Sequence, residues 1–141
     1  MSSRRWLLAL SIVLLAVAVG AALITVPAAA KEGVRATLEQ PVRLGAQAGQ
    51  TIRVAWRLLD ENGRRFGASG IYLRVSRCGR GPLMVPAAKH GHGRYVARVN
   101  MPQGGVRKLI VGLKGWRIIG KRTQRADVFF QFDPVLSRRC A

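Results

Sequence analysis

His90 and His92 are separated by one residue and are the only histidines in the chain. Residues i and i+2 of a strand lie on the same face, so the two imidazoles are placed to bind one Cu(II) or Zn(II) ion. Met84 and Met101 are candidate thioether ligands for Cu(I). The neighbouring Lys89 repels a cation, and the glycines around the histidines also fit an exposed, metal-free loop. A copper or zinc site at His90 and His92 is therefore one alternative, and a loop without metal is the other.

The densest cationic stretch of the chain runs from Lys114 to Arg125 and contains a tryptophan. Basic groups are attracted to anionic lipid or polymer, and a tryptophan can lie with its apolar body against an interface. The same pattern also fits a loop that packs its tryptophan. The candidate residues for binding an anionic surface are Lys114, Trp116, Arg117, Lys121, Arg122 and Arg125.

Further basic residues occupy outward positions of expected strands. The outward residues are Arg53, Arg57, Arg74 and Arg98, and Arg107 and Lys108 begin another expected strand. If these strands are neighbours, the residues form one basic sheet face; if they are not, they belong to separate solvated faces.

Patterns typical of catalysis are lacking in this sequence. Ser69, Ser76 and Ser137 are the only serines after residue 30, and none lies in a G-x-S-x-G context. Asp60 and Glu61 are adjacent, as in a solvated turn, whereas acid–base catalysis needs two carboxylates that face each other. No phosphate-binding loop or dinucleotide fingerprint occurs. We therefore expect no enzyme and no obligate cofactor.

The chain is strongly basic, with a formal net charge of +18 from 24 cationic and six acidic residues. Arg4 and Arg5 are the only cations before residue 31, so residues 31–141 keep 22 cations and all six acids, a net charge of +16. A field of this sign attracts polyanions. The charge therefore favours attraction to an anionic envelope surface, of lipid headgroups or polymer. The cations are scattered along the chain and not gathered in one run, which does not indicate a dedicated nucleic-acid site.

The first 30 residues read as an export signal. Arg4 and Arg5 precede the apolar run Trp6–Ile24, and Ala28 and Ala30 stand at the two positions that a signal peptidase reads. The apolar run is also close to the ~20 residues that span a bilayer. We expect either a cleaved signal peptide over residues 1–30 or a membrane anchor at residues 6–24, and both place residues 31–141 outside the cytoplasm.

The chain has two cysteines, Cys78 and Cys140. In an oxidising compartment an even number of cysteines favours pairing. The spacing of these two does not suit a zinc site or a CxxC redox pair. A disulfide between them would tie the C-terminal tail to the middle of the domain.

Residues that alternate between apolar and polar indicate strands after residue 33. Alternation is clear in Thr51–Leu59, Ile71–Arg77 and Arg94–Met101, and is also present around Val111 and Phe130. Weaker strands are expected at Val34–Leu38 and Leu83–Val85. Turn sequences rich in Gly, Pro and Asn separate them, so the pattern predicts an all-β domain at residues 31–141, an antiparallel sandwich or barrel of about seven strands.

The order of these turns and strands resembles small exported Ig-like domains of the YtkA-like and copper-resistance CopC-like type, and uncharacterised secreted proteins of high-GC bacteria. The resemblance covers roughly residues 45–115. It rests on Gly49-Gln50-Thr51, Asp60-Glu61-Asn62-Gly63, Gly93-Arg94-Tyr95 and Pro102-Gln103-Gly104-Gly105. It implies an Ig-like β-sandwich with an extracytoplasmic binding or accessory role. A CopC-type copper site has a histidine near the mature N-terminus, and this chain has none before His90.

Overall fold

The computed structural model describes residues 33–140, which form ten β-strands and no helix. The predicted signal or anchor at residues 1–30 lies outside the described residues. No helix able to cross a membrane is present in the described part of the chain. The strands are β1 (Arg35–Leu38), β2 (Thr51–Leu59), β3 (Ile71–Arg77), β4 (Leu83–Pro86), β5 (Ala88–Lys89), β6 (Arg94–Asn100), β7 (Val106–Leu113), β8 (Trp116–Ile119), β9 (Arg122–Arg125) and β10 (Val128–Phe130).

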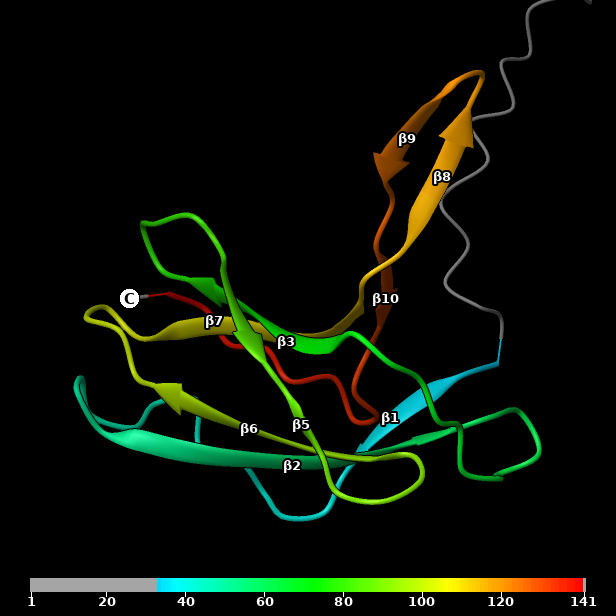
Figure 1. Cartoon of the computed structure of the whole chain (residues 1–141). Helices are drawn as coiled ribbons and strands as arrows, with labels where there is room; N and C mark the ends of the chain where they lie inside the picture. The colour runs from blue at the N-terminus through cyan, green and yellow to red at the C-terminus, as the bar shows by residue number, and fades with distance from the viewer. Residues whose placement is uncertain (1–32, 141) are drawn as a thin grey trace, which may run out of the picture.

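Eight of these strands form two antiparallel sheets that lie as layers, as Figure 1 shows. One sheet has the order β1-β2-β6-β5, and the other has the order β10-β7-β3-β4. The predicted all-β class is confirmed, and the two layers are consistent with a β-sandwich. β2 and β3 have the bounds that the alternating pattern predicts, because each places every second side chain in the core and leaves the others outside.

The core lies between the two sheets and is closed by aromatic rings. Trp56 of β2 stacks on Tyr95 of β6 and meets Phe132 edge to face, with ring centroids 6.0 Å apart in both pairs. The Tyr95 hydroxyl accepts a hydrogen bond from the Ala68 amide at 2.7 Å and donates one to the Ala68 carbonyl at 2.8 Å. This pair of bonds fixes the loop that precedes β3 to the core.

A disulfide joins Cys78 to Cys140, with the two Cα atoms 5.7 Å apart. The disulfide holds the C-terminal tail beside β7, where Ser137 and Lys108 form an isolated antiparallel β-bridge through their backbones. The Arg138 amide also donates to the Arg107 carbonyl at 2.8 Å. The tail therefore extends the edge of the sheet beyond β10. A disulfide is consistent with an extracytoplasmic location.

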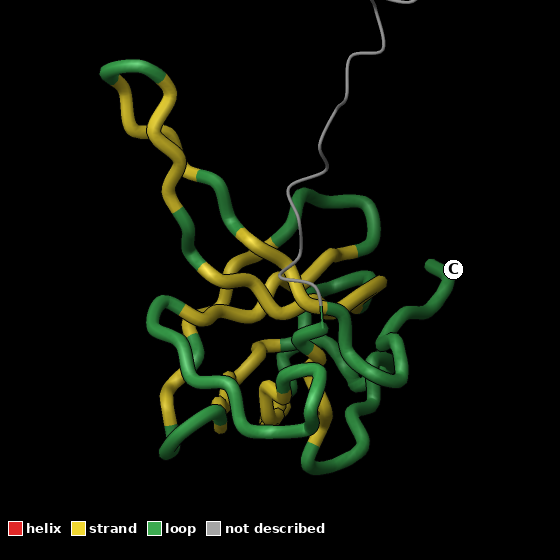
Figure 2. Tube along the Cα trace, turned by 90° about the vertical axis from the view of Figure 1, so that its right-hand side faces the viewer, coloured by secondary structure: helices red, strands yellow, loops and turns green. Residues whose placement is uncertain are grey.

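The remaining two strands, β8 and β9, pair only with each other and form a hairpin that projects away from both sheets (Figures 1 and 2). The sequence-based alternative of a loop that packs its tryptophan is wrong here, because Trp116 is 69% exposed. We call residues 114–125 the projecting hairpin.

Candidate functional site

The projecting hairpin is built around a two-residue turn. Gly120 has a φ of 60°, and Lys121, like every non-glycine residue described, has a negative φ. A glycine with positive φ at the first central position is typical of a type II′ turn, which suits the twist of a two-stranded hairpin. Ile119 and Arg122 therefore face each other next to the turn.

The strand register distributes apolar and basic side chains over both faces of the projecting hairpin. Trp116 is opposite Arg125 and Ile118 is opposite Thr123, so these four share one face; Ile119 lies on the other, opposite Arg122. Every residue of β8 and β9 is exposed, and the exposed fractions of Ile118 and Ile119 are 77% and 53%. Neither sheet covers the hairpin, so its apolar side chains are in water.

Asp127 fixes the root of the projecting hairpin. Its carboxylate accepts hydrogen bonds from Arg125 Nε and Nη2, both at 2.8 Å, and one from the Tyr72 hydroxyl. The Gly115 amide donates to the same carboxylate at 3.4 Å. The Ala126 amide donates to the Gly115 carbonyl at 2.9 Å, which closes the two strands of the stem. These contacts attach the stem to β3.

The pKa values of Asp127 and Tyr72, at the root of the hairpin, are both shifted from their ordinary values. The pKa of Asp127 is lowered to about 2, mainly by the hydrogen bonds from Arg125 and then, against the opposing effect of burial, by the hydrogen bond from the Tyr72 hydroxyl. Burial and, second, the hydrogen bond to the Asp127 carboxylate together raise the pKa of Tyr72 to about 12. Asp127 is therefore a charged anchor that holds Arg125 in place.

Gly112 provides the space for this root. It lies opposite Tyr72 in the register of β3 and β7, and a Cβ at Gly112 would overlap the Tyr72 ring. The ring lies against the bare backbone and is 3% exposed although it is on the outer face. Tyr72, Gly112 and Asp127 are residues that sequence reasoning did not identify. The sequence carries little sign of this cluster, because the three residues are far apart in the chain and only the strand pairing brings them together.

The structure places all six predicted anionic-surface residues on the projecting hairpin. Arg125 forms an ion pair with Asp127. The Arg125 guanidinium also lies over the Tyr72 ring, 6.0 Å from the ring centroid. The other four cations have no ion pair within residues 33–140. Ile118 and Ile119, which were not among the predicted residues, lie on the same hairpin. The four unpaired cations are Lys114, Arg117, Lys121 and Arg122.

The predicted metal ligands have separate surroundings. His90 lines a cavity on the outer face of β6, whereas His92 Nε2 is 3.1 Å from the Arg65 carbonyl. Met101 is buried in the core, and Met84 contacts Arg125. Within residues 33–140 no group of three or more His, Cys, Asp or Glu side chains is placed to hold a metal ion. A metal site formed by the two histidines stays a prediction.

The basic strand residues divide between the two sheets. Arg53 and Arg57 of β2 share an outer face with Arg98 of β6. Arg74 belongs to the other sheet, where its guanidinium lies 5.2 Å from the centroid of the Phe129 ring. Lys108 is on that second sheet as well, opposite Ser76. The strands do not form a single basic face, because the core separates the two sets.

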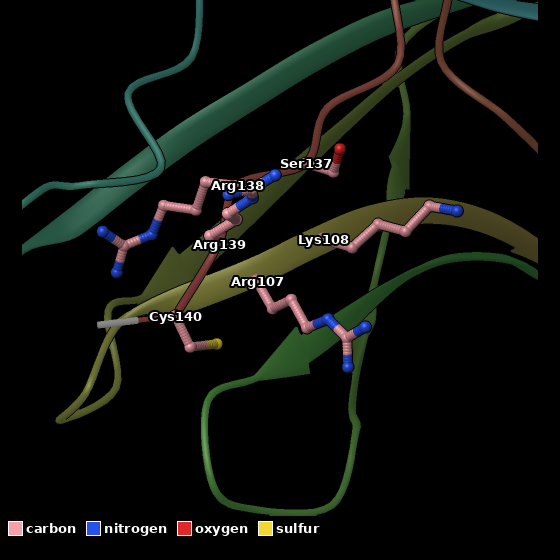
Figure 3. Close-up of a pocket in the computed structure, with 6 residues that line it drawn as sticks. All are labelled: Arg107, Lys108, Ser137, Arg138, Arg139 and Cys140. Carbon is pink, nitrogen blue, oxygen red and sulfur yellow. The ribbon is translucent and has the colours of Figure 1, made fainter.

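A further basic cavity, of about 810 Å³, lies where the C-terminal tail runs beside β7. Figure 3 shows that the charged ends of its side chains point in different directions. Arg138 donates to the Val106 carbonyl at 2.9 Å, so its guanidinium supports the tail. The cavity is lined by Arg107, Lys108, Ser137, Arg138, Arg139 and Cys140.

The chain matches no protein-family model, no curated protein and no solved structure with which it was compared.

Proposed function

We propose that this protein is a non-catalytic binding module of the cell envelope, an Ig-like β-sandwich outside the cytoplasm that docks on anionic lipid membranes through the projecting hairpin. The observation that carries the proposal is the exposure of Trp116, Ile118 and Ile119 on a projecting element that also bears four unpaired cations. The disulfide between Cys78 and Cys140 supports the extracytoplasmic location.

The apolar side chains favour a membrane over other anionic partners. Full burial of an isoleucine-sized side chain is worth about 1.5–3 kcal/mol, and tryptophan is enriched at the membrane–water interface. A hydrated polymer or a nucleic-acid backbone offers the cations a partner but gives Ile118 and Ile119 no apolar phase. A lipid bilayer provides both.

The cations add an electrostatic attraction. Each Lys or Arg near an anionic leaflet contributes about 1 kcal/mol, so Lys114, Arg117, Lys121 and Arg122 together contribute about 4 kcal/mol. Asp127 neutralises Arg125 and at the same time holds the stem in position, which limits the entropy lost when the hairpin meets the surface.

Vesicle binding tests the proposal with a domain that begins at Lys31. Among the described residues, the buried core runs from Ala36 to Phe132 and the disulfide joins residues 78 and 140, so this domain retains the described core. It has two tryptophans, of which Trp56 is buried. The fluorescence change on binding therefore reports on Trp116. We expect a blue shift with phosphatidylglycerol-containing vesicles and none with phosphatidylcholine alone.

Paired variants separate the hairpin from the general charge of the protein. Arg117→Gln with Arg122→Gln removes about 2 kcal/mol of attraction, which is roughly 30-fold in affinity. The matched control, Arg64→Gln with Arg80→Gln, removes the same charge from exposed loops. Equal weakening by the two pairs, or binding to the vesicles without a Trp116 blue shift, would contradict the proposal. Preference for nucleic acid over vesicles would favour a different partner class.

A further inference from the structure

Two pairs of arginines lie on the outer face of the sheet β1-β2-β6-β5. The register places Arg53 directly opposite Arg98 and Arg57 directly opposite Arg94. The two pairs are four residues apart along β2, or about 13 Å. Ala55 and Val96 occupy the row between them. Like charges directly opposite on neighbouring strands are destabilising, so an anion bound between the members of a pair relieves their repulsion.

The pair Arg57 and Arg94 has such an anion in the chain itself. The Glu39 carboxylate accepts hydrogen bonds from Arg94 Nε at 2.8 Å and Nη2 at 2.8 Å, and from Arg57 Nε at 3.0 Å. The pKa of Glu39 is lowered to about 2. The hydrogen bond from Arg94 has the largest effect, burial opposes it, and the hydrogen bond from Arg57 lowers the pKa as well. One carboxylate therefore satisfies two facing guanidinium groups.

The pair Arg53 and Arg98 has the same cross-strand arrangement but no carboxylate. Within residues 33–140 neither side chain has a hydrogen bond or an ion pair. The carboxylates that form ion pairs in this part of the chain are all engaged by other arginines: Glu39 by Arg57 and Arg94, Asp127 by Arg125 and Asp133 by Arg35.

A cavity of about 510 Å³ lies over the unpaired arginines. Arg53, Arg98 and His90 are its polar lining residues, and the rest of its wall is apolar. No acidic residue lines it. The cavity thus combines facing guanidinium groups, which bind carboxylate and phosphate through paired hydrogen bonds, with an apolar wall. The apolar lining residues are Val85, Pro86, Ala88 and Val96.

We infer that Arg53 and Arg98 bind an external oxyanion, a carboxylate attached to a small apolar group, in the manner that Arg57 and Arg94 bind Glu39. The site lies on a sheet face, separate from the projecting hairpin, and does not depend on membrane docking. The apolar wall distinguishes a short-chain carboxylate from inorganic phosphate, because only the former places carbon atoms against Val85 and Val96.

Titration of the domain that begins at Lys31 tests this inference by NMR of the arginine Nε–Hε groups. Butyrate, acetate and inorganic phosphate are compared with chloride at equal ionic strength. We expect saturable shifts at Arg53 and Arg98, tighter for butyrate than for acetate. Stronger saturation by phosphate than by butyrate would reassign the ligand class and overturn the carboxylate proposal. Linear shifts equal to those in chloride would show that no site exists.

Variant stability provides a second measurement that needs no ligand. Arg53→Gln with Arg98→Gln removes an uncompensated repulsion, so we expect the thermal midpoint at low ionic strength to rise by about 1–5 °C. The stabilisation by butyrate should disappear in the same variant. Arg64→Gln with Arg80→Gln is the matched control and should retain the butyrate effect. A lower midpoint for the Arg53 and Arg98 variant, or retained stabilisation by butyrate, would overturn the inference.

Discussion

Strands β2 and β8 both carry a tryptophan and isoleucine in an antiparallel pair, yet they have opposite surroundings. Trp56 of β2 is fully buried between the two sheets, while Trp116 of β8 is 69% exposed. The difference arises because β2 pairs with β1 and β6 and is covered by a second sheet, whereas β8 pairs only with β9. Pairing alone does not bury a side chain; a second layer does.

We therefore expect the sandwich to carry the stability of the domain and the projecting hairpin to carry the proposed membrane binding. Removal of apolar surface from water is the main source of folding free energy, and Trp116, Ile118 and Ile119 contribute little of it. Such exposed apolar side chains mark an interaction surface when they gather on one element. Substitutions should therefore affect either stability or binding, according to the region in which they lie.

The largest loss of stability is expected for Trp56→Ala. The ring packs on Tyr95 and Phe132, and truncation of a fully buried aromatic side chain costs about 3–5 kcal/mol. Urea unfolding followed by circular dichroism measures this loss. A cost below about 1 kcal/mol would mean that the core is not organised around Trp56.

The next largest effect is expected for Cys78→Ser with Cys140→Ser. The disulfide spans a sequence separation of 62 residues, and a loop of this length is worth about 3–4 kcal/mol in the chain-entropy model. Urea midpoints of the variant and of the oxidised protein give the difference. We expect vesicle binding to persist in the variant where it remains folded, since within residues 33–140 no hydrogen bond or ion pair joins the hairpin root to the tail.

Acid should weaken the domain through Glu39 and Asp127. Both carboxyls have a folded pKa of about 2, below their ordinary values of 4.5 and 3.8. The unfolded chain therefore takes up protons first as pH falls, so the stability that these ion pairs add is present above pH 4.5 and is lost toward pH 2. In the Glu39→Gln variant, the urea midpoint of unfolding should fall less steeply as the pH is lowered from 4.5 toward 2. The same pH dependence in the variant and the original protein would show that the contacts of Glu39 with Arg57 and Arg94 add no stability.

The smallest effect on stability is expected for Trp116→Ser with Ile118→Ser. Both side chains are exposed, so the free energy of unfolding, measured with urea, should change by no more than about 0.5 kcal/mol. Affinity for anionic vesicles should fall at least about tenfold, because the apolar contacts with lipid are lost. A large loss of stability with unchanged vesicle binding would reverse the roles that the comparison assigns to the two regions.

Strands with one buried face were predictable from the sequence. Thr51–Leu59 and Ile71–Arg77 alternate because the core takes every second side chain, and the structure reproduces their bounds. The projecting hairpin was not predicted as strands because both of its faces are solvated, which removes the alternation. Its turn signal, Gly120 followed by Lys121, was present and is compatible with a type II′ turn. β5 has two residues, too few for any periodic pattern.

The sequence by itself determined the positions of the main strands, the strong positive charge and the presence of two cysteines able to pair. Only the tertiary structure decided that Arg53 faces Arg98, that Arg74 lies on the opposite sheet and that Trp116 is exposed where Trp56 is buried. The physical reason is that periodicity along one strand specifies which side chains share a face. Which strand lies beside it, and whether a second layer covers that face, depends on contacts between residues far apart in the chain.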